Sequence, residues 1–300
     1  MTIFLTGATG FIGGAVAFRL KASGHRIRGL VRSPEKAERL RALGIEPVLG
    51  DLSDTALLAR EAETADAVVN TADSDDRPAV EAFLDALAGS GKPFLHTSGT
   101  SVVADDARGE WASDRVYDED TPVEPVPGKA ARVAIDRMIV DAAGRGVRAI
   151  VLCNSLIYGT GPGLHPDSVQ IPTLVAEARR TGVVRHIGRG LNIWSNVHVD
   201  DMADLYALAL DRAPAGAFYY VENGEASFAE AAAAIARRLG LAAPRPWPAD
   251  EAIAALGFGH AVYALGSNSR VRGKRARAEL GWAPKHASLI EWIETEMPVG

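Results

Sequence analysis

The chain has 300 residues, of which 47% are hydrophobic and 23% charged, and its formal net charge is −6 at pH 7. This composition is typical of a soluble globular protein and gives no electrostatic basis for binding nucleic acid or an anionic membrane. The single cysteine, Cys153, excludes an internal disulfide and fits a cytoplasmic location, and we expect it to lie buried in a strand. No apolar run approaches the ~20 residues that would span a bilayer.

In the first half of the chain, short β-rich runs alternate with amphipathic stretches. We predict strands at 2–6, 25–31, 45–49, 66–70, 93–97 and 147–153, and helices at 11–23, 34–43, 55–61, 78–89 and 129–143. With right-handed crossovers, this alternation predicts an α/β fold in which residues 1–153 form a doubly wound parallel sheet, the Rossmann arrangement that binds dinucleotides.

After residue 153 the alternation breaks into loops rich in Gly and Pro. We predict a helix near 171–181, a strand near 194–199, and helices at 201–211, 227–239 and 270–279. Residues 154–300 are therefore expected to form a smaller substrate lobe, interleaved with elements that return to the core at about 193–212.

A glycine-rich loop follows the first predicted strand. TIFLTGATGFIGG places Gly7, Gly10 and Gly13 at three-residue spacing between a strand and a helix. Gly7 allows a tight turn, Gly10 lets the backbone approach a pyrophosphate, and Gly13 lets helix and strand pack closely. The helix N-terminus then faces the phosphates, so this loop, including Thr9, Phe11 and Ile12, predicts a dinucleotide site.

The end of the second strand bears on the choice of dinucleotide. An NAD site usually has an acidic residue there, whereas this strand ends in Val31 and Arg32. Arg32 can hold a 2′-phosphate bidentately and Ser33 can add a hydroxyl, so NADP is predicted over NAD. The alternative is that Arg32 is a solvated loop side chain.

Two further strand ends are expected to reach the cofactor. Asp51, after the third strand, can accept from the adenine amino group while Leu52 packs on the ring; alternatively, Asp51 caps the next helix. Thr71 and Ala72, after the fourth strand, are small residues placed where the ribose and nicotinamide should pass.

These segments resemble the extended or atypical short-chain dehydrogenase/reductases, the NAD-dependent epimerase/dehydratase family. TGATGFIGG, GDLSD, FLHTSGTSVV, LCNSLIYGTGPG, NVHVDDMADLYALAL and RARAELGWAP match the family's order over nearly the whole chain. The family contains reductases, epimerases, dehydratases and NADP sensors without activity, so the resemblance implies the fold more strongly than the reaction.

The resemblance also implies a catalytic hydroxyl after the fifth strand and a Tyr-x-x-x-Lys on the next helix. Ser98 and Thr100, with Ser101 beside them, supply the hydroxyls expected to orient a substrate oxygen. The tyrosine is missing: aligning Arg132 with the family lysine places Gly128 at the tyrosine position, and aligning Lys129 places Pro125 there. We prefer the Arg132 alignment, in which Arg132 fixes the cofactor but cannot act as an acid.

Other residues are candidates for the missing proton donor. Tyr158 follows the sixth strand, His165 lies in the expected substrate loop, and Lys129 is the third candidate. Asn154 stands where the family usually has proline, and it is expected either to contact the nicotinamide or to form a simple turn. His198 is interpreted as structural.

Substrate contacts are expected from residues 160–195 and the C-terminal lobe. Trp194, Trp247, Phe258 and Tyr263 could form apolar walls, and Arg185, Arg189 and Arg270 could meet an anion. Asp200 and Asp201 are expected to cap the helix that follows. No metal site is predicted, because His, Cys and carboxylates do not cluster with ligand spacing.

Together these features predict an NADP-dependent oxidoreductase acting on a small carbonyl or hydroxyl compound with a degenerate Tyr-x-x-x-Lys site. The alternatives are a nucleotide-sugar epimerase or dehydratase, and a non-catalytic NADP(H)-binding redox sensor. A homodimer is expected from the resemblance, by pairing of the helices at 78–89 and 129–143. Val80, Phe83, Leu84 and Leu87 fit that pairing and fit packing on the sheet equally well.

Overall fold

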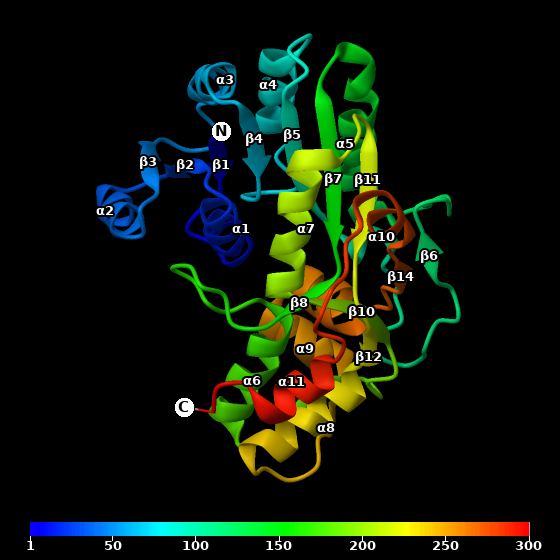
Figure 1. The fold of residues 1–300 in the computed structure, drawn as a ribbon. Coiled ribbons are helices and arrows are strands. Elements are labelled where there is room, and N and C mark those ends of the chain that lie inside the picture. Colours follow the sequence, from blue (N-terminus) through cyan, green and yellow to red (C-terminus); the bar gives the residue numbers. More distant parts are fainter. Residues whose placement is uncertain (300) are drawn as a thin grey trace.

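A seven-stranded parallel sheet forms the centre of the computed structural model, which describes residues 1–299 (Figure 1). The strands run in the order β3–β2–β1–β4–β5–β7–β11, and every neighbouring pair is parallel. Their bounds are β1 (Thr2–Thr6), β2 (Arg26–Val31), β3 (Glu46–Leu49), β4 (Ala67–Asn70), β5 (Pro93–Gly99), β7 (Arg148–Asn154) and β11 (Ala217–Val221). The strand order reverses between β1 and β4, which opens a crevice at the carboxyl ends of the strands.

Helices cover both faces of the sheet, so the predicted doubly wound α/β fold is confirmed. One face is buried by α1 (Phe11–Ala22), α2 (Pro34–Ala42) and α7 (Val199–Arg212). The other face is buried by α3 (Thr55–Thr64), α4 (Arg77–Leu87) and α5 (Ala130–Asp141). Short 3-10 turns at Thr100–Val103, Pro127–Lys129 and Ala142–Arg145 follow β5 and flank α5.

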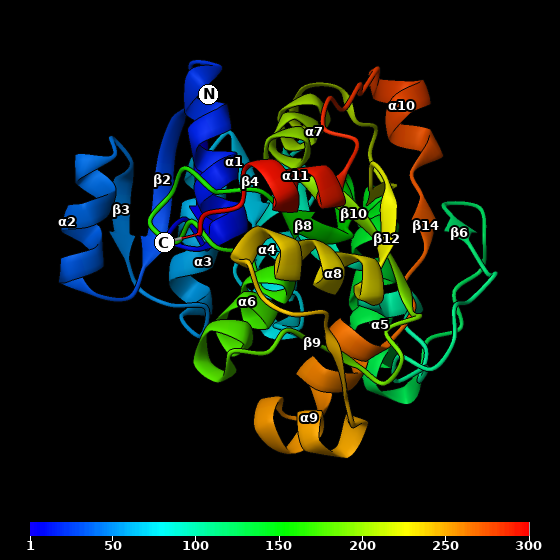
Figure 2. The same cartoon turned by 90° about the horizontal axis from the view of Figure 1, so that it is seen from below.

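A smaller lobe lies below the carboxyl ends of the strands (Figures 1 and 2). It contains a three-stranded sheet and a two-stranded sheet, formed by β8 (Leu156–Tyr158), β10 (Ile193–His198) and β12 (Glu225–Ser227), and by β9 (Arg185–Ile187) and β13 (Arg245–Trp247). Its helices are α6 (Gln170–Thr181), α8 (Phe228–Leu239), α9 (Ala249–Leu256), a π-helix (Gly259–Gly266) and α11 (Leu289–Thr295). Trp194, Trp247 and Trp292 are buried in this lobe's own core, so the first two do not form walls of a substrate cleft.

Several elements differ from the sequence-based expectation. Strand β11 was not predicted, although it completes the main sheet beside β7. The helix expected at 270–279 begins later, as α10 (Lys274–Leu280), because Val271 and Arg272 form β14 and pair with β6 (Tyr117–Asp118). Cys153 is fully buried in β7, as expected.

The apolar residues of α4 pack inside the chain. Val80, Phe83, Leu84 and Leu87 are at most 1% exposed and belong to the core between α4 and the sheet. Of the two alternatives for these side chains, packing on the sheet is therefore the one the structure shows. Pairing of α4 and α5 between two copies would therefore have to use other side chains of these helices.

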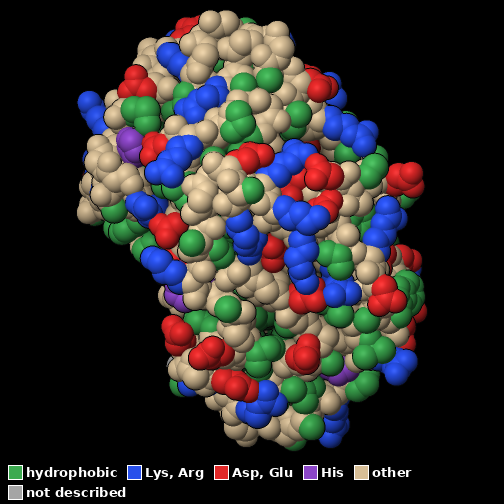
Figure 3. Space-filling model, turned by 45° about the vertical axis from the view of Figure 1, so that its right-hand side comes forward, with side chains coloured by type: hydrophobic (Ala, Val, Ile, Leu, Met, Phe, Trp, Pro, Cys, Tyr) green, Lys and Arg blue, Asp and Glu red, His purple; other side chains and the backbone are tan. Residues whose placement is uncertain are grey.

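The molecular surface mixes charges of both signs. On the face in Figure 3, Lys and Arg side chains alternate with Asp and Glu. Around β14 and α10, several of these charges form ion pairs, including Lys274 with Asp118, Arg275 with Asp120 and Arg277 with Glu222. Within residues 1–299, no helix combines the length and the apolar character needed to cross a membrane.

Candidate functional site

The glycine loop between β1 and α1 leaves no room for side chains at its key positions. Gly7 has a φ of +73°, and a Cβ there would lie 2.6 Å from the Thr71 hydroxyl oxygen. A Cβ on Gly13 would overlap the Gly7 carbonyl oxygen. The turn is closed by the Gly10 amide, which donates to the Gly7 carbonyl at 2.8 Å. The loop therefore lies against the tip of β4, as the glycine spacing predicts.

The first turn of α1 is open to an anion. Its N-cap is Gly10, whose missing side chain cannot cap the helix, and no acidic residue occupies the first turn. The amide groups at this end thus keep their hydrogen-bonding capacity and the partial positive charge of the helix. This is the arrangement that binds a phosphate group.

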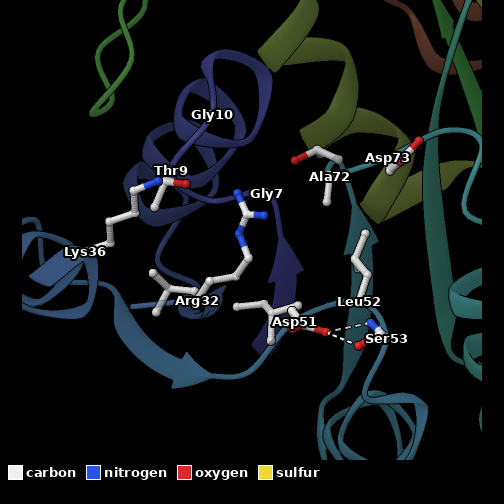
Figure 4. A pocket seen from close by; sticks show the side chains of 13 residues that line it. Gly7, Thr9, Gly10, Arg32, Lys36, Asp51, Leu52, Ser53, Ala72 and Asp73 are labelled. Carbon is white, nitrogen blue, oxygen red and sulfur yellow. Dashed lines mark hydrogen bonds between the residues drawn. The ribbon is translucent and has the colours of Figure 1, made fainter. Parts of the chain in front are cut away.

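A cavity of about 590 Å³ extends from this loop along the ends of β2, β3 and β4 (Figure 4). Arg32 and Lys36 both line it, and Figure 4 shows both side chains pointing into it. Within the described chain, neither of these two cations has an ion-pair partner. Lys36 was missed by the sequence analysis, although it lies in the first turn of α2, four residues after Arg32.

Ser33 and Asp51, which were also predicted to contact the cofactor, make hydrogen bonds with neighbouring residues of the chain. Ser33 is the N-cap of α2, and its hydroxyl accepts from the Lys36 amide at 3.3 Å. Asp51 accepts from the amide and hydroxyl of Ser53, which lowers the pKa of its carboxyl below the usual value. Asp51 and Leu52 both line the cavity, while Asp54 is the residue that caps α3.

A second cavity, of about 280 Å³, continues on the other side of the glycine loop. Gly10, Phe11, Ile12, Gly13 and Thr71 form one side of it. Ser155 and Ile157, which follow β7, form part of the rest, together with 168–170 at the start of α6. The two cavities share Gly10 and Thr71, so they lie at the two ends of one groove over the glycine loop.

Arg132, on α5, is held at the carboxyl edge of the sheet by Asp75. Its Nε atom donates to Asp75 Oδ1 at 2.8 Å, and a second guanidinium nitrogen contacts Oδ2. The hydrogen bonds from Arg132 lower the pKa of Asp75. A third nitrogen of Arg132 donates to the Ser101 hydroxyl at 3.4 Å. Asp75 was not identified from the sequence, because it pairs with Arg132 from a loop far away in the chain.

Ser98 and Thr100, which were expected to orient a substrate oxygen, both turn their hydroxyls into the protein. Ser98 is 2% exposed, and its hydroxyl donates to the buried Asp136 carboxylate at 2.7 Å. Thr100 is fully buried and accepts from the Ser269 hydroxyl at 2.8 Å. Ser101, the last hydroxyl residue of the TSGTS segment, is the one that lies beside Arg132.

Asn154 ends β7 with its side chain buried. Its amide nitrogen donates to the Tyr206 hydroxyl at 2.9 Å, and its amide oxygen has no hydrogen-bond partner within residues 1–299. A buried oxygen without a donor is costly unless a ligand or water supplies one. Asn154 precedes Ser155, which lines the second cavity.

The predicted capping role of Asp200 and Asp201 is wrong, because His198 is the N-cap of α7 and its ring accepts from the Asp200 amide. Asp201 instead accepts from the amides of Lys285 and His286, both at 2.9 Å. His198, Asp200 and His286 come close enough for their ligand atoms to lie within 4.8 Å of one another, although the sequence spacing did not suggest it. The Nδ1 atoms of both histidines already have partners in the protein.

Comparison with known proteins finds relatives that match nearly the whole chain. The chain is 32% identical to the uncharacterized protein C2A9.02 of Schizosaccharomyces pombe, with 97% of each chain covered. It is 30% identical to oxidase ucsJ of Acremonium sp, with 97% of this chain and 95% of the relative covered. It is also 26% identical to 4-hydroxy-2-methyl-3-oxo-4-farnesyl-3,4-dihydroquinoline-1-oxide ketoreductase of Stigmatella aurantiaca, with 100% and 98% covered.

The fold has solved counterparts. The dTDP-glucose 4,6-dehydratase of Bacillus anthracis, solved in complex with NAD, superimposes with a TM-score of 0.75 at 20% identity, with 99% of this chain and 97% of that chain covered. The profile of the NAD dependent epimerase/dehydratase family matches residues 3–221, which include the glycine loop, Arg132 and β11. The chain therefore belongs to the NAD dependent epimerase/dehydratase family.

Proposed function

We propose that this protein is an NADP-dependent oxidoreductase that interconverts a small carbonyl compound and its alcohol. The observation that carries the proposal is the pair of cations, Arg32 and Lys36, that line the first cavity without ion-pair partners. The end of β2 offers no carboxylate to the ribose, and a guanidinium with an ammonium beside it suits a 2′-phosphate. The ketoreductase among the relatives supports the reaction type.

The residues present fit such a cofactor at three points. The open N-terminus of α1 would bind the pyrophosphate, Arg32 and Lys36 the 2′-phosphate, and the buried Asn154 oxygen the carboxamide. Thr71 and Ala72 would lie beside the ribose on the nicotinamide side. When bound there, NADPH supplies a hydride to the carbonyl carbon of the substrate.

The chain's own residues would prepare the oxygen end of the reaction. Arg132 keeps a fixed positive charge beside the Ser101 hydroxyl, and Asp75 holds the guanidinium in place. Negative charge develops on the carbonyl oxygen as hydride adds, so a preorganised cation and a hydroxyl donor would stabilise the transition state. Because Ser98 and Thr100 are engaged in the interior, Ser101 is the hydroxyl we assign to this position.

A nucleotide-sugar epimerase or dehydratase is a weaker alternative. Such a substrate needs cationic groups around its diphosphate. Arg270, one of the three arginines considered for that role, is already bound by Glu225, with Nη2 and Oε1 2.7 Å apart. Arg185 stacks on the Trp247 ring, with its guanidinium carbon 5.6 Å from the ring centroid.

A redox sensor, the third function considered, would bind NADPH tightly and catalyse no turnover.

Substitution of Arg32 tests the cofactor assignment. Arg32→Ala should weaken NADPH binding about ten- to a hundredfold, because a charged hydrogen bond to the phosphate is lost, and leave NADH binding unchanged. The measurement is calorimetric titration with each nucleotide. Arg39→Ala is the matched control, since Arg39 is exposed on α2, the helix that follows Arg32, and lies outside the cavity. Tighter binding of NADH than NADPH by the unmodified protein would contradict the assignment.

Assays against aldehydes, ketones and sugar nucleotides separate the three functions. We expect NADPH oxidation with a small aldehyde or ketone. Tight NADPH binding without turnover of any compound would favour the sensor, and turnover confined to sugar nucleotides would favour the epimerase or dehydratase.

A further inference from the structure

The position one helical turn before Arg132 is filled by a side chain from elsewhere in the chain. Gly128 stands at this position, and a Cβ built on it would lie 2.8 Å from the Tyr263 hydroxyl oxygen. The same Cβ would lie 3.1 Å and 3.2 Å from two ring carbons of Tyr263. The φ of Gly128 is outside the left-handed region, so its backbone could carry a side chain. A side chain there would have to displace the phenol of Tyr263.

The segment that carries Tyr263 is hydrogen-bonded to the start of α6. Tyr263 belongs to the π-helix Gly259–Gly266, and its carbonyl accepts from the Ser267 hydroxyl at 2.7 Å. Gln170, which lines the second cavity, donates to the neighbouring Ala264 carbonyl at 2.9 Å. Single π-helical turns are rare and are found frequently at functional sites. The π-helix thus contacts the start of α6 through Gln170 and the turn before α5 through Tyr263.

A cation and an aromatic ring complete the surroundings of Tyr263. The ammonium of Lys129 lies 5.0 Å from the Tyr263 ring centroid. The Phe258 and Tyr263 rings pack nearly at right angles, with their centroids 5.5 Å apart. Phe258 limits the positions that the ring can take.

We propose that Tyr263 supplies the proton that the missing helix tyrosine would supply, from the π-helix in place of α5. The inference rests on the reductase function proposed above. With NADPH as the reductant, hydride forms a new C–H bond at the carbonyl carbon and the π electrons of the C=O bond pass to oxygen. That oxygen takes the hydroxyl proton of Tyr263, and the resulting tyrosinate, beside Lys129, takes a proton from solvent.

The hydroxyls of Tyr158 and Tyr206 are engaged elsewhere. The Tyr158 hydroxyl donates to the His286 carbonyl at 3.2 Å, and burial raises the pKa of this phenol well above its usual value. The Tyr206 hydroxyl is fully buried between Thr97 and Asn154. His165 is exposed in the loop before α6, and Arg132 does not release a proton near neutral pH.

Removal of a single hydroxyl tests the proposal. Tyr263→Phe should lower kcat for carbonyl reduction about 10²- to 10⁴-fold, while NADPH binding and the melting temperature stay unchanged. Tyr158→Phe is the matched control and should keep kcat within about threefold. A second measurement needs no turnover: in the complex with NADP⁺, calorimetry should show the aldehyde binding about two- to tenfold more weakly to Tyr263→Phe, because one hydrogen bond to its oxygen is lost.

A substitution at Gly128 tests the same contact from the other side. Gly128→Ala keeps the Tyr263 hydroxyl but displaces it. As a single substitution it should therefore lower kcat, and added to Tyr263→Phe it should have little further effect. Unchanged kcat and unchanged aldehyde binding in Tyr263→Phe, with an active parent enzyme, would overturn the role of Tyr263 alone. If the parent protein binds NADPH but neither reduces nor binds any carbonyl compound, the proposed function and this inference both fail.

Discussion

The carboxyl group of Asp136 is buried where a charge is poorly solvated. One of its oxygens accepts from Ser98, and the other has no hydrogen-bond partner in the described part of the chain. Burial raises the pKa of Asp136 to about 7, against a usual value of 3.8. Below that pH the folded protein therefore carries this side chain in its neutral form.

This pKa sets the sign of a pH effect on stability. Between about pH 4 and pH 7 the folded state binds a proton at Asp136 that the unfolded state has already released, so the stabilisation is lost as the pH rises. We expect the free energy of unfolding of the parent protein to fall over this range relative to that of Asp136→Asn. Urea unfolding at several pH values measures it. Asp141→Asn, on an exposed position of the same helix, should follow the parent protein.

Single residues differ in how far the sequence could reveal them. The glycines and Arg32 follow from local spacing, because strand, loop and helix are consecutive in the chain. Asp75, Ser269 and Tyr263 meet their partners Arg132, Thr100 and Gly128 only after the chain has folded back on itself. The inward rotation of Ser98 and Thr100 could not be predicted either, since it depends on Asp136 and Ser269.

At the scale of elements, the start of α7 fastens the C-terminal segment to the core. Asp201 is 1% exposed, and its carboxylate accepts from two amides, those of Lys285 and His286. The Asp201 carbonyl also accepts from the indole nitrogen of Trp282 at 2.9 Å. The segment 282–286 thus depends on one carboxylate for most of its hydrogen bonds to α7.

Replacing that carboxylate should loosen the segment. Asp201→Ala leaves two amides without an acceptor, and we expect the free energy of unfolding to fall by roughly 2–4 kcal/mol. Thermal and urea unfolding provide the measurement. Asp200→Ala is the control, because Asp200 is exposed and contacts only the His198 ring through its side chain. An equal loss in both variants would contradict the role assigned to Asp201.

Elements with a local signal were predictable, and those made by distant pairing were not. Helix α8 begins with a capping box at Ser227 and Glu230 and agrees within a residue with the range 227–239. Strands β6, β8, β9, β13 and β14 have only two or three residues each, too few for a periodic pattern, and each exists because of a partner strand far away in the sequence.

On the scale of the whole molecule, the core sheet is completed by residues from beyond the first half of the chain. Helix α7 covers one face of the sheet with Leu205, Tyr206 and Leu210, all fully buried. Strand β11 pairs with β7 over five residues, from Ala217 with Ile150 to Val221 with Asn154. The sequence pattern predicted the returning helix but not the strand, because AFYYV is a short apolar run that periodicity cannot assign.

A shortened chain tests how far the first half depends on these returning elements. Residues 1–153 alone would expose the sheet face beneath α7 and the unpaired edge of β7. We expect this fragment to aggregate or to lack a cooperative thermal transition, whereas the full chain unfolds cooperatively. Circular dichroism during heating makes the comparison. A soluble fragment with a sharp transition would show that the first half folds without α7 and β11.

The loop between β8 and α6 crosses the start of α1 at a contact between two glycines. A Cβ on Gly14 would lie 3.0 Å from the Gly163 Cα atom, and a Cβ on Gly161 would lie 2.9 Å from the Phe11 ring. A dinucleotide lying in the groove over Gly10 would thus be roofed by backbone on its nicotinamide side. For the nucleotide to leave on this side, residues 159–169 would have to move away from α1. The rate of that movement would then set the residence time of the nucleotide.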